Sequence, residues 1–331
     1  MDSRKVLVCF IGLHLWVSAA VSSPSTTSEL WGSGLIRITL LWLAFISLSY
    51  LLSRDALATG TRPVFLLSWT KSARWGEGLA FFLILLVMMQ VYMTLKIAIP
   101  KFVPFYADPY IAQIDRLIFG TDSWQITHAL LGAKGTYVLD QIYLWPCAIV
   151  SFGMSLWACF SSDRAFSRRS VLAICMSWLL LGSWVALLFS SAGPVFFEHF
   201  YGETDFSELA SNLQPDLMAV RTQAYLLDNF GRPGFGKGIS AMPSMHNATY
   251  VLLICMLYER FGNSWPTWIA VAFESVVFVA SVHLGWHYAI DGIVSAVLVP
   301  IVWFAVRKFE GTPFRVSIYL NTLTKPSVRE A

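Results

Sequence analysis

Residues 79–99 read LAFFLILLVMMQVYMTLKIAI, a run of 21 residues in which Lys96 is the single charged side chain. A helix of about 20 apolar residues crosses the hydrocarbon core of a bilayer, so this run predicts a membrane-spanning helix. A strand is a poor alternative, because outside a closed barrel its backbone groups would stay unpaired in lipid. The composition agrees: 56% of the residues are hydrophobic and 13% are charged.

Seven further segments have the same character. With the first, we expect eight membrane helices, at residues 6–20, 36–52, 79–99, 137–160, 171–190, 242–258, 265–282 and 287–306. The predicted fold class is therefore all-α, a polytopic membrane helix bundle of about eight transmembrane helices with a six-helix core. We divide the chain into N-terminal spans at 1–76, a membrane core at 77–308 and a tail at 309–331. The first segment fits a membrane anchor and a cleavable signal peptide equally well, since Arg4-Lys5 and an apolar stretch precede small residues at 18–22.

The basic residues predict the orientation of the bundle. If the spans alternate, 15 of the 23 Lys and Arg residues fall on one side, which the positive-inside rule places in the cytoplasm together with both termini. The long loops at 100–136 and 191–241 then lie outside, and the first of them is a candidate for a segment along the membrane interface. The net charge of +3 reflects this topology and gives no reason to expect nucleic acid. The absence of organelle retrieval signals favours a bacterial inner membrane.

Two polar segments stand at the outer ends of predicted spans. One reads Pro243-Ser244-Met245-His246 and the other His287-Tyr288-Ala289-Ile290-Asp291, so both histidines fall at the same membrane depth. Because His287 and Asp291 are four residues apart, they share one face of a helix. Asp291 would accept a hydrogen bond from one ring nitrogen and leave the other as a nucleophile. His246 is then free to act as general acid and base, and the pattern predicts phosphoryl transfer on a lipid.

Other polar residues near these segments are weaker signals. The glycine-rich stretch at 231–238 precedes the sixth span, and backbone N–H groups beside cations form anion sites. We expect substrate phosphate to be bound by four residues of this region, Ser244, Arg232, Lys237 and Arg221. Glu274 and Asp140 lie within predicted spans, and the sequence names no partner for either, so both are assigned structural roles. No metal site and no cofactor are expected.

The two motifs resemble those of the type 2 phosphatidic acid phosphatase superfamily, which has Pro-Ser-x-His and a last motif ending in His-x-x-x-Asp. The His-Tyr-x-x-Asp form is most similar to the inositol phosphorylceramide synthase and sphingomyelin synthase-like (inositolphosphotransferase) branch, as is Ser190-Ser191-Ala192-Gly193-Pro194. The resemblance covers residues 78–306. It implies a metal-independent enzyme in which His287 is the nucleophile, Asp291 its partner and His246 the acid and base.

The sequence departs from the phosphatase pattern at its phosphate-binding cations. Ser281 stands six residues before His287, where the pattern has arginine, and Tyr225 stands in the place of a motif lysine. These departures favour the headgroup-transferase branch.

Several functions remain open at this point. A lipid phosphotransferase would use a phospholipid or lipid phosphate as donor and a lipid hydroxyl as acceptor, whereas a lipid phosphate phosphatase would use water. Two histidines and a carboxylate also form a facial triad for iron, although no flanking ligand pattern supports it. A non-catalytic transporter or scaffold would keep the fold without turnover.

Overall fold

The computed structural model describes residues 10–18, 75–232 and 236–311. The predicted span at 36–52 lies outside these ranges, and of the predicted span at 6–20 the described part, 10–18, is helical. No strand occurs in the described part of the chain, which confirms the all-α prediction.

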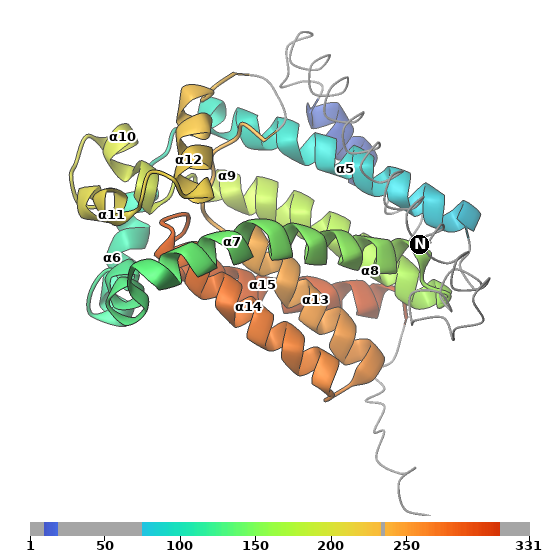
Figure 1. Cartoon of the computed structure of the whole chain (residues 1–331). Coiled ribbons are helices and arrows are strands. Elements are labelled where there is room, and N and C mark those ends of the chain that lie inside the picture. Colours follow the sequence, from blue (N-terminus) through green and yellow to red (C-terminus); the bar gives the residue numbers. More distant parts are fainter. Residues whose placement is uncertain (1–9, 19–74, 233–235, 312–331) are drawn as a thin grey trace, which may run out of the picture.

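Six long helical segments form a bundle (Figure 1). Five of them are long and apolar enough to cross a membrane, so this is an integral membrane protein. The sixth has 17 residues, about 25 Å of helix, and packs against both of its neighbours in sequence. In chain order the segments are α5 (Trp75–Phe102), α7 (Ser123–Phe160), α8 (Arg164–Met176) continued by η2 (Ser177–Val185) and α9 (Ala186–Leu188), α13 (Met245–Phe261), α14 (Trp265–His283) and α15 (Ala289–Phe309).

Local sequence signals set where these helices begin and bend. Ser244 caps α13, and its hydroxyl oxygen accepts the backbone N–H of Asn247 at 3.5 Å. At the start of α15, the Asp291 side chain accepts the backbone N–H of Tyr288 in a capping box. The 38-residue helix α7 is bent at Gly132, whose φ of +57° a residue with a side chain rarely adopts. The π-helical η2 follows α8 without a break.

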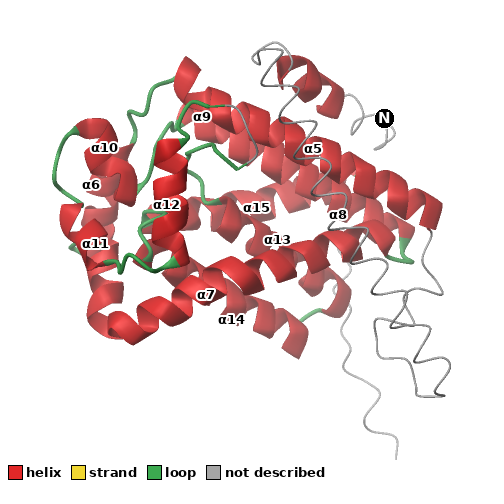
Figure 2. Ribbon diagram, turned by 45° about the horizontal axis from the view of Figure 1, so that its top comes forward, coloured by secondary structure: helices red, strands yellow, loops and turns green. Residues whose placement is uncertain are grey.

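Short helices gather at one end of the bundle (Figure 2). They are α6 (Asp108–Phe119), η3 (Pro194–Phe196), α10 (Phe197–Tyr201), α11 (Ser207–Asn212) and α12 (Met218–Asp228). Asp140 of α7 caps α12, because its carboxylate accepts the backbone N–H groups of Met218 at 3.0 Å and Ala219 at 2.8 Å. Asp140, for which the sequence predicts a structural role, thus has hydrogen-bond partners in α12.

The opposite end of the bundle is basic and tightly paired. Glu259 of α13 forms ion pairs with Arg169 of α8 and, at 2.9 Å, with Arg307 of α15. Buried charges need partners, and this cluster joins three helices through one carboxylate. Cations concentrated at this end are the pattern that the positive-inside rule associates with the cytoplasm.

Candidate active site

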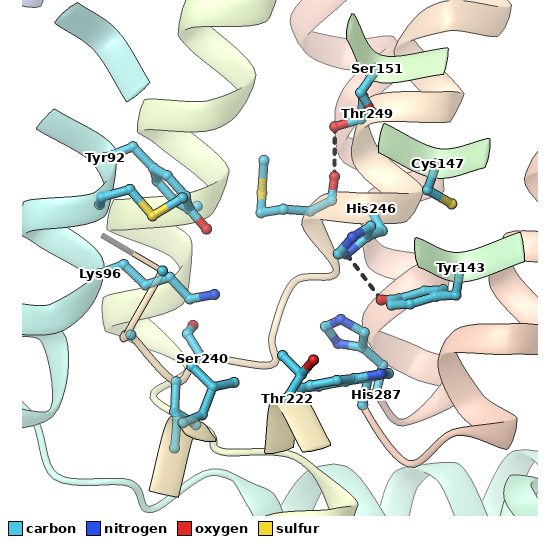
Figure 3. A pocket seen from close by; sticks show the side chains of 18 of the residues that line it. Tyr92, Lys96, Tyr143, Cys147, Ser151, Thr222, Ser240, His246, Thr249 and His287 are labelled. Atoms are coloured by element: carbon cyan, nitrogen blue, oxygen red, sulfur yellow. Dashed lines mark hydrogen bonds between the residues drawn. The ribbon is translucent and has the colours of Figure 1, made fainter. Parts of the chain in front are cut away.

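A cavity of about 500 Å³ opens at the end of the bundle that carries the short helices. Its walls come from α5, α7, η2, α12, α13, the segment that precedes α13 and the turn that precedes α15. The outer part is polar and includes Lys96, Thr222, Ser240, His246 and His287 (Figure 3). The inner part, between α5, α7 and η2, is lined by apolar side chains such as Met89, Leu144 and Trp178.

His287 reaches this cavity from the turn between α14 and α15. Its Nδ1 donates a hydrogen bond to Asp291 Oδ2 at 3.2 Å, as predicted from the four-residue spacing. The same oxygen accepts the backbone N–H of Tyr288 at 3.1 Å, and Asp291 is fully buried. Because Nδ1 is occupied, Nε2 is the ring nitrogen left to act as a nucleophile.

His246 lies in the first turn of α13 and lines the same cavity, so the structure brings together the two histidines that the sequence singled out. Its Nδ1 shares a hydrogen bond with the Tyr143 hydroxyl at 3.0 Å, and the two rings lie 4.4 Å apart. This contact fixes the imidazole so that Nε2 is the atom able to exchange a proton in the cavity. Tyr143 is a site residue that sequence reasoning missed, because nothing in a membrane span marks one tyrosine among many.

Ser244, which the sequence predicts to bind substrate, is not among the residues that line the cavity. The residue is fully buried, and its hydroxyl donates to Asn247 Oδ1 at 2.7 Å. Asn247 in turn donates to Glu274 Oε1 at 3.0 Å. Ser244 therefore belongs to a polar chain that anchors the start of α13, and Glu274 has its partner there.

The three predicted phosphate-binding cations also lie outside the cavity lining. Arg221 is exposed on α12, Arg232 is exposed at the start of the glycine-rich segment, and Lys237 is half-buried. Of the described residues of that segment, Gly236 and Gly238 line the cavity. The cation that does line the cavity comes from another helix, α5.

Lys96, near the end of α5, points into the cavity from the wall opposite the histidines (Figure 3). Among the described residues, no carboxylate lies within ion-pair distance of its ammonium group. A cation left without an acidic partner beside two histidines is suited to bind an anion. The sequence contains a signal for this residue, because an ionisable side chain inside an apolar membrane segment indicates a functional site.

The carboxylate of Asp108, at the start of α6, holds the loops around the site. Asp108 Oδ1 accepts the backbone N–H of Gly193 at 2.7 Å, and Oδ2 accepts that of Ala192 at 2.8 Å. The Tyr201 and Tyr288 hydroxyls also donate to this carboxylate. Burial raises the pKa of Asp108, and these four hydrogen bonds act in the opposite direction.

The segment at 190–194 links this carboxylate to the start of α13. Its Ser191 accepts the backbone N–H of Ala241 at 2.9 Å through the carbonyl and that of Met242 at 2.9 Å through the hydroxyl. Gly193 has a φ of +105°, and a Cβ there would lie 2.6 Å from the Trp286 carbonyl oxygen, so only glycine fits. The segment thus holds both histidine-bearing loops in place.

Comparison with known proteins identifies the family of the chain. A family model described as PAP2 superfamily matches residues 109–305, more than half of the chain. The chain belongs to the PAP2 superfamily. The match supports an enzyme of the phosphatase or phosphotransferase type that acts on lipid phosphates. The searches of curated proteins and of solved structures gave no match.

Proposed function

We propose that this protein transfers a phosphoryl or phospho-headgroup from a donor lipid to an acceptor hydroxyl through a covalent intermediate on His287. The observation that carries the proposal is the pairing of His287 Nδ1 with the buried Asp291 at 3.2 Å, in a cavity shared with His246 and Lys96. A histidine oriented by a carboxylate is the arrangement of an activated nucleophile.

In the first step His287 Nε2 attacks phosphorus, and the bond from phosphorus to the leaving oxygen breaks. His246, protonated at the start of the cycle, donates its Nε2 proton to that oxygen and becomes neutral, so the donor lipid leaves as an alcohol. Asp291 stabilises the positive charge that forms on the His287 ring when the new N–P bond is made. The Lys96 ammonium balances the negative charge of the transferred group.

In the second step the acceptor hydroxyl attacks the same phosphorus while His246 removes its proton. The N–P bond breaks, and His287 returns to its neutral form. A lipid hydroxyl as acceptor gives a new phospholipid, and water gives free phosphate or a free phospho-headgroup. Both reactions share the first step, so the acceptor decides whether the enzyme is a transferase or a phosphatase.

Two features favour a transferase with lipid substrates. The cavity continues inward from the histidines along apolar residues of α5, α7 and η2, where hydrocarbon is held more readily than water. The His-Tyr-x-x-Asp form of the last motif resembles the inositolphosphotransferase-like branch, and Ser281 and Tyr225 replace the phosphatase cations. We place the site on the extracytoplasmic face, since the basic end of the bundle lies opposite the cavity.

The test uses purified protein in detergent–lipid micelles that contain EDTA. A panel of phospholipids and lipid phosphates is supplied with and without diacylglycerol or ceramide, while free phosphate and new lipids are both followed. A new phospholipid that requires the acceptor supports the transferase. Free phosphate that does not depend on the acceptor makes the enzyme a phosphatase. No turnover with any donor overturns both the transferase and the phosphatase and favours a transporter or scaffold. The His287→Ala variant is the control for contaminating activity.

A further inference from the structure

Helix α6 has its carboxylates inside and most of its large apolar side chains outside; Ile111 is the buried exception. Asp108 and Asp115 are 0% and 2% exposed, whereas Leu117 and Ile118 are 77% and 53% exposed. Tyr110 and Ile114 are also exposed, and together these four residues recur at the spacing of one helix face. In water the opposite arrangement is favoured, because exposed apolar surface is costly and buried carboxylates need partners.

The surroundings of α6 indicate what covers this face. The helix follows directly on α5, whose last residue Phe102 is exposed, and precedes the exposed Leu130 in the first turns of α7. The apolar face is therefore continuous along the chain with helices that cross the bilayer. At another edge of α6, Arg116 forms ion pairs with Asp122 at 2.7 Å and with Asp205 of the outer loop at 3.0 Å. A helix with one apolar face and one charged edge is typical of the membrane interface.

The buried face of α6 contacts the segment that bears His287. Asp115 Oδ1 accepts the backbone N–H of Ile290 at 3.0 Å, and its other oxygen accepts the Ser123 hydroxyl. Asp108 accepts the Tyr288 hydroxyl at 3.1 Å. Both aspartates thus bind residues between His287 and Asp291, and the position of α6 fixes the position of this segment.

We propose that α6 lies in the outer interfacial layer of the bilayer, with Tyr110, Ile114, Leu117 and Ile118 in contact with lipid, and that this contact holds the catalytic segment in place through Asp108 and Asp115. The aspartates act as positioning residues, since neither lines the cavity. The effect on turnover rests on the proposed function, whereas the contact with lipid does not.

The contact with lipid is tested by a polarity-sensitive bimane label on Leu117→Cys, in vesicles whose acyl chains carry bromine. Ala210→Cys is the control, because Ala210 is exposed on α11 in the outer loop and is not part of the apolar face of α6. Wild-type protein labelled in parallel gives the background from native cysteines. We expect strong quenching at position 117 and weak quenching at position 210. Equal weak quenching at both positions, or shielding at 117 that grows with protein concentration, overturns the proposal in favour of water or a second copy.

The effect on turnover is tested by Leu117→Glu against Ala210→Glu, which add the same charge at exposed helical positions on α6 and α11. The substrate is a short-chain, water-soluble lipid phosphate, so that delivery through the membrane does not limit the rate. We expect Leu117→Glu to lower kcat about five-fold or more and Ala210→Glu to leave it unchanged. Equal kcat values overturn the coupling. If wild-type protein has no turnover, the proposed function fails instead, and the quenching experiment still decides whether α6 contacts lipid.

Discussion

Asp108 and Tyr288 are joined by a hydrogen bond of 3.1 Å, although 180 positions separate them in the chain. The oxygen that accepts it, Oδ1, also accepts the N–H of Gly193. One buried carboxylate therefore connects the segment at 190–194 to the segment that carries His287. The site depends on α6 for its shape, even though α6 supplies no residue to the cavity lining.

Replacing Asp108 with Asn tests this connection. Two donors bind each oxygen of the carboxylate, and the amide has one oxygen only. At least one buried donor therefore loses its partner, at a cost of about 1–3 kcal/mol. We expect a lower midpoint of thermal unfolding and a lower kcat. Tyr288→Phe removes a single hydroxyl and is expected to have the smaller effect, near 1 kcal/mol. If Asp108→Asn unfolds and turns over like wild type, Asp108 does not hold the site.

Lys96→Ala tests whether the phosphate-binding cation is Lys96, which lines the cavity, or one of the cations of the glycine-rich segment that the sequence predicts. A hydrogen bond to a charged group contributes about 1.5–3 kcal/mol, so we expect kcat/KM to fall about 10- to 100-fold. Arg232→Ala, which removes an exposed cation outside the cavity lining, is expected to stay near wild type. Steady-state kinetics on a lipid phosphate decide between them, and the reverse ranking would return the role to the glycine-rich segment.

Tyr143→Phe removes the hydrogen bond to His246 Nδ1 and leaves the rest of the cavity wall in place. Because the His246 ring would lose its fixed orientation, we expect kcat to fall about ten-fold with little change in stability. Tyr137→Phe is the matched control: Tyr137 lies on the same helix and donates to Asp216 at 2.7 Å, outside the cavity lining. Equal kcat values for the two variants would remove Tyr143 from the mechanism.

Turnover is expected to continue in EDTA. In the proposed mechanism the histidines supply the nucleophile and the proton, and Lys96 supplies the positive charge, so no step requires a divalent cation. The measurement compares initial rates before and after dialysis against chelator. Loss of turnover that Mg²⁺, Mn²⁺ or Fe²⁺ restores would contradict this account, and restoration by Fe²⁺ alone would support the facial-triad alternative.

The parts of the fold that the sequence predicts well are those decided by local composition. Each of the six predicted spans from residue 79 onward overlaps a long helix of the structure, since about 20 apolar residues suffice to predict a spanning helix. His287 and Asp291 were paired by their spacing along one chain segment. His246 was placed beside them by membrane depth, which needs only the order of the spans.

The rest of the site depends on contacts between distant segments. Lys96 lies in a different helix from either histidine, and only the packing of α5 against α7 and η2 brings it into the cavity. From the sequence, Asp108 and Asp115 look like solvent-facing residues of a surface helix, whereas both are buried in the structure. Ser244 caps α13 in the structure, and the sequence alone does not distinguish a helix cap from a substrate ligand, because both are a hydroxyl just before a helix.

The most direct test of the central claim is mass spectrometry of the protein quenched at alkaline pH during turnover, in EDTA and with a lipid donor. The account predicts an acid-labile adduct on His287, with the mass of the transferred phosphoryl or phospho-headgroup, that disappears when acceptor is added. It also predicts that His287→Ala has neither adduct nor turnover. Turnover by His287→Ala, or an adduct on another residue in the wild-type protein, would contradict the account.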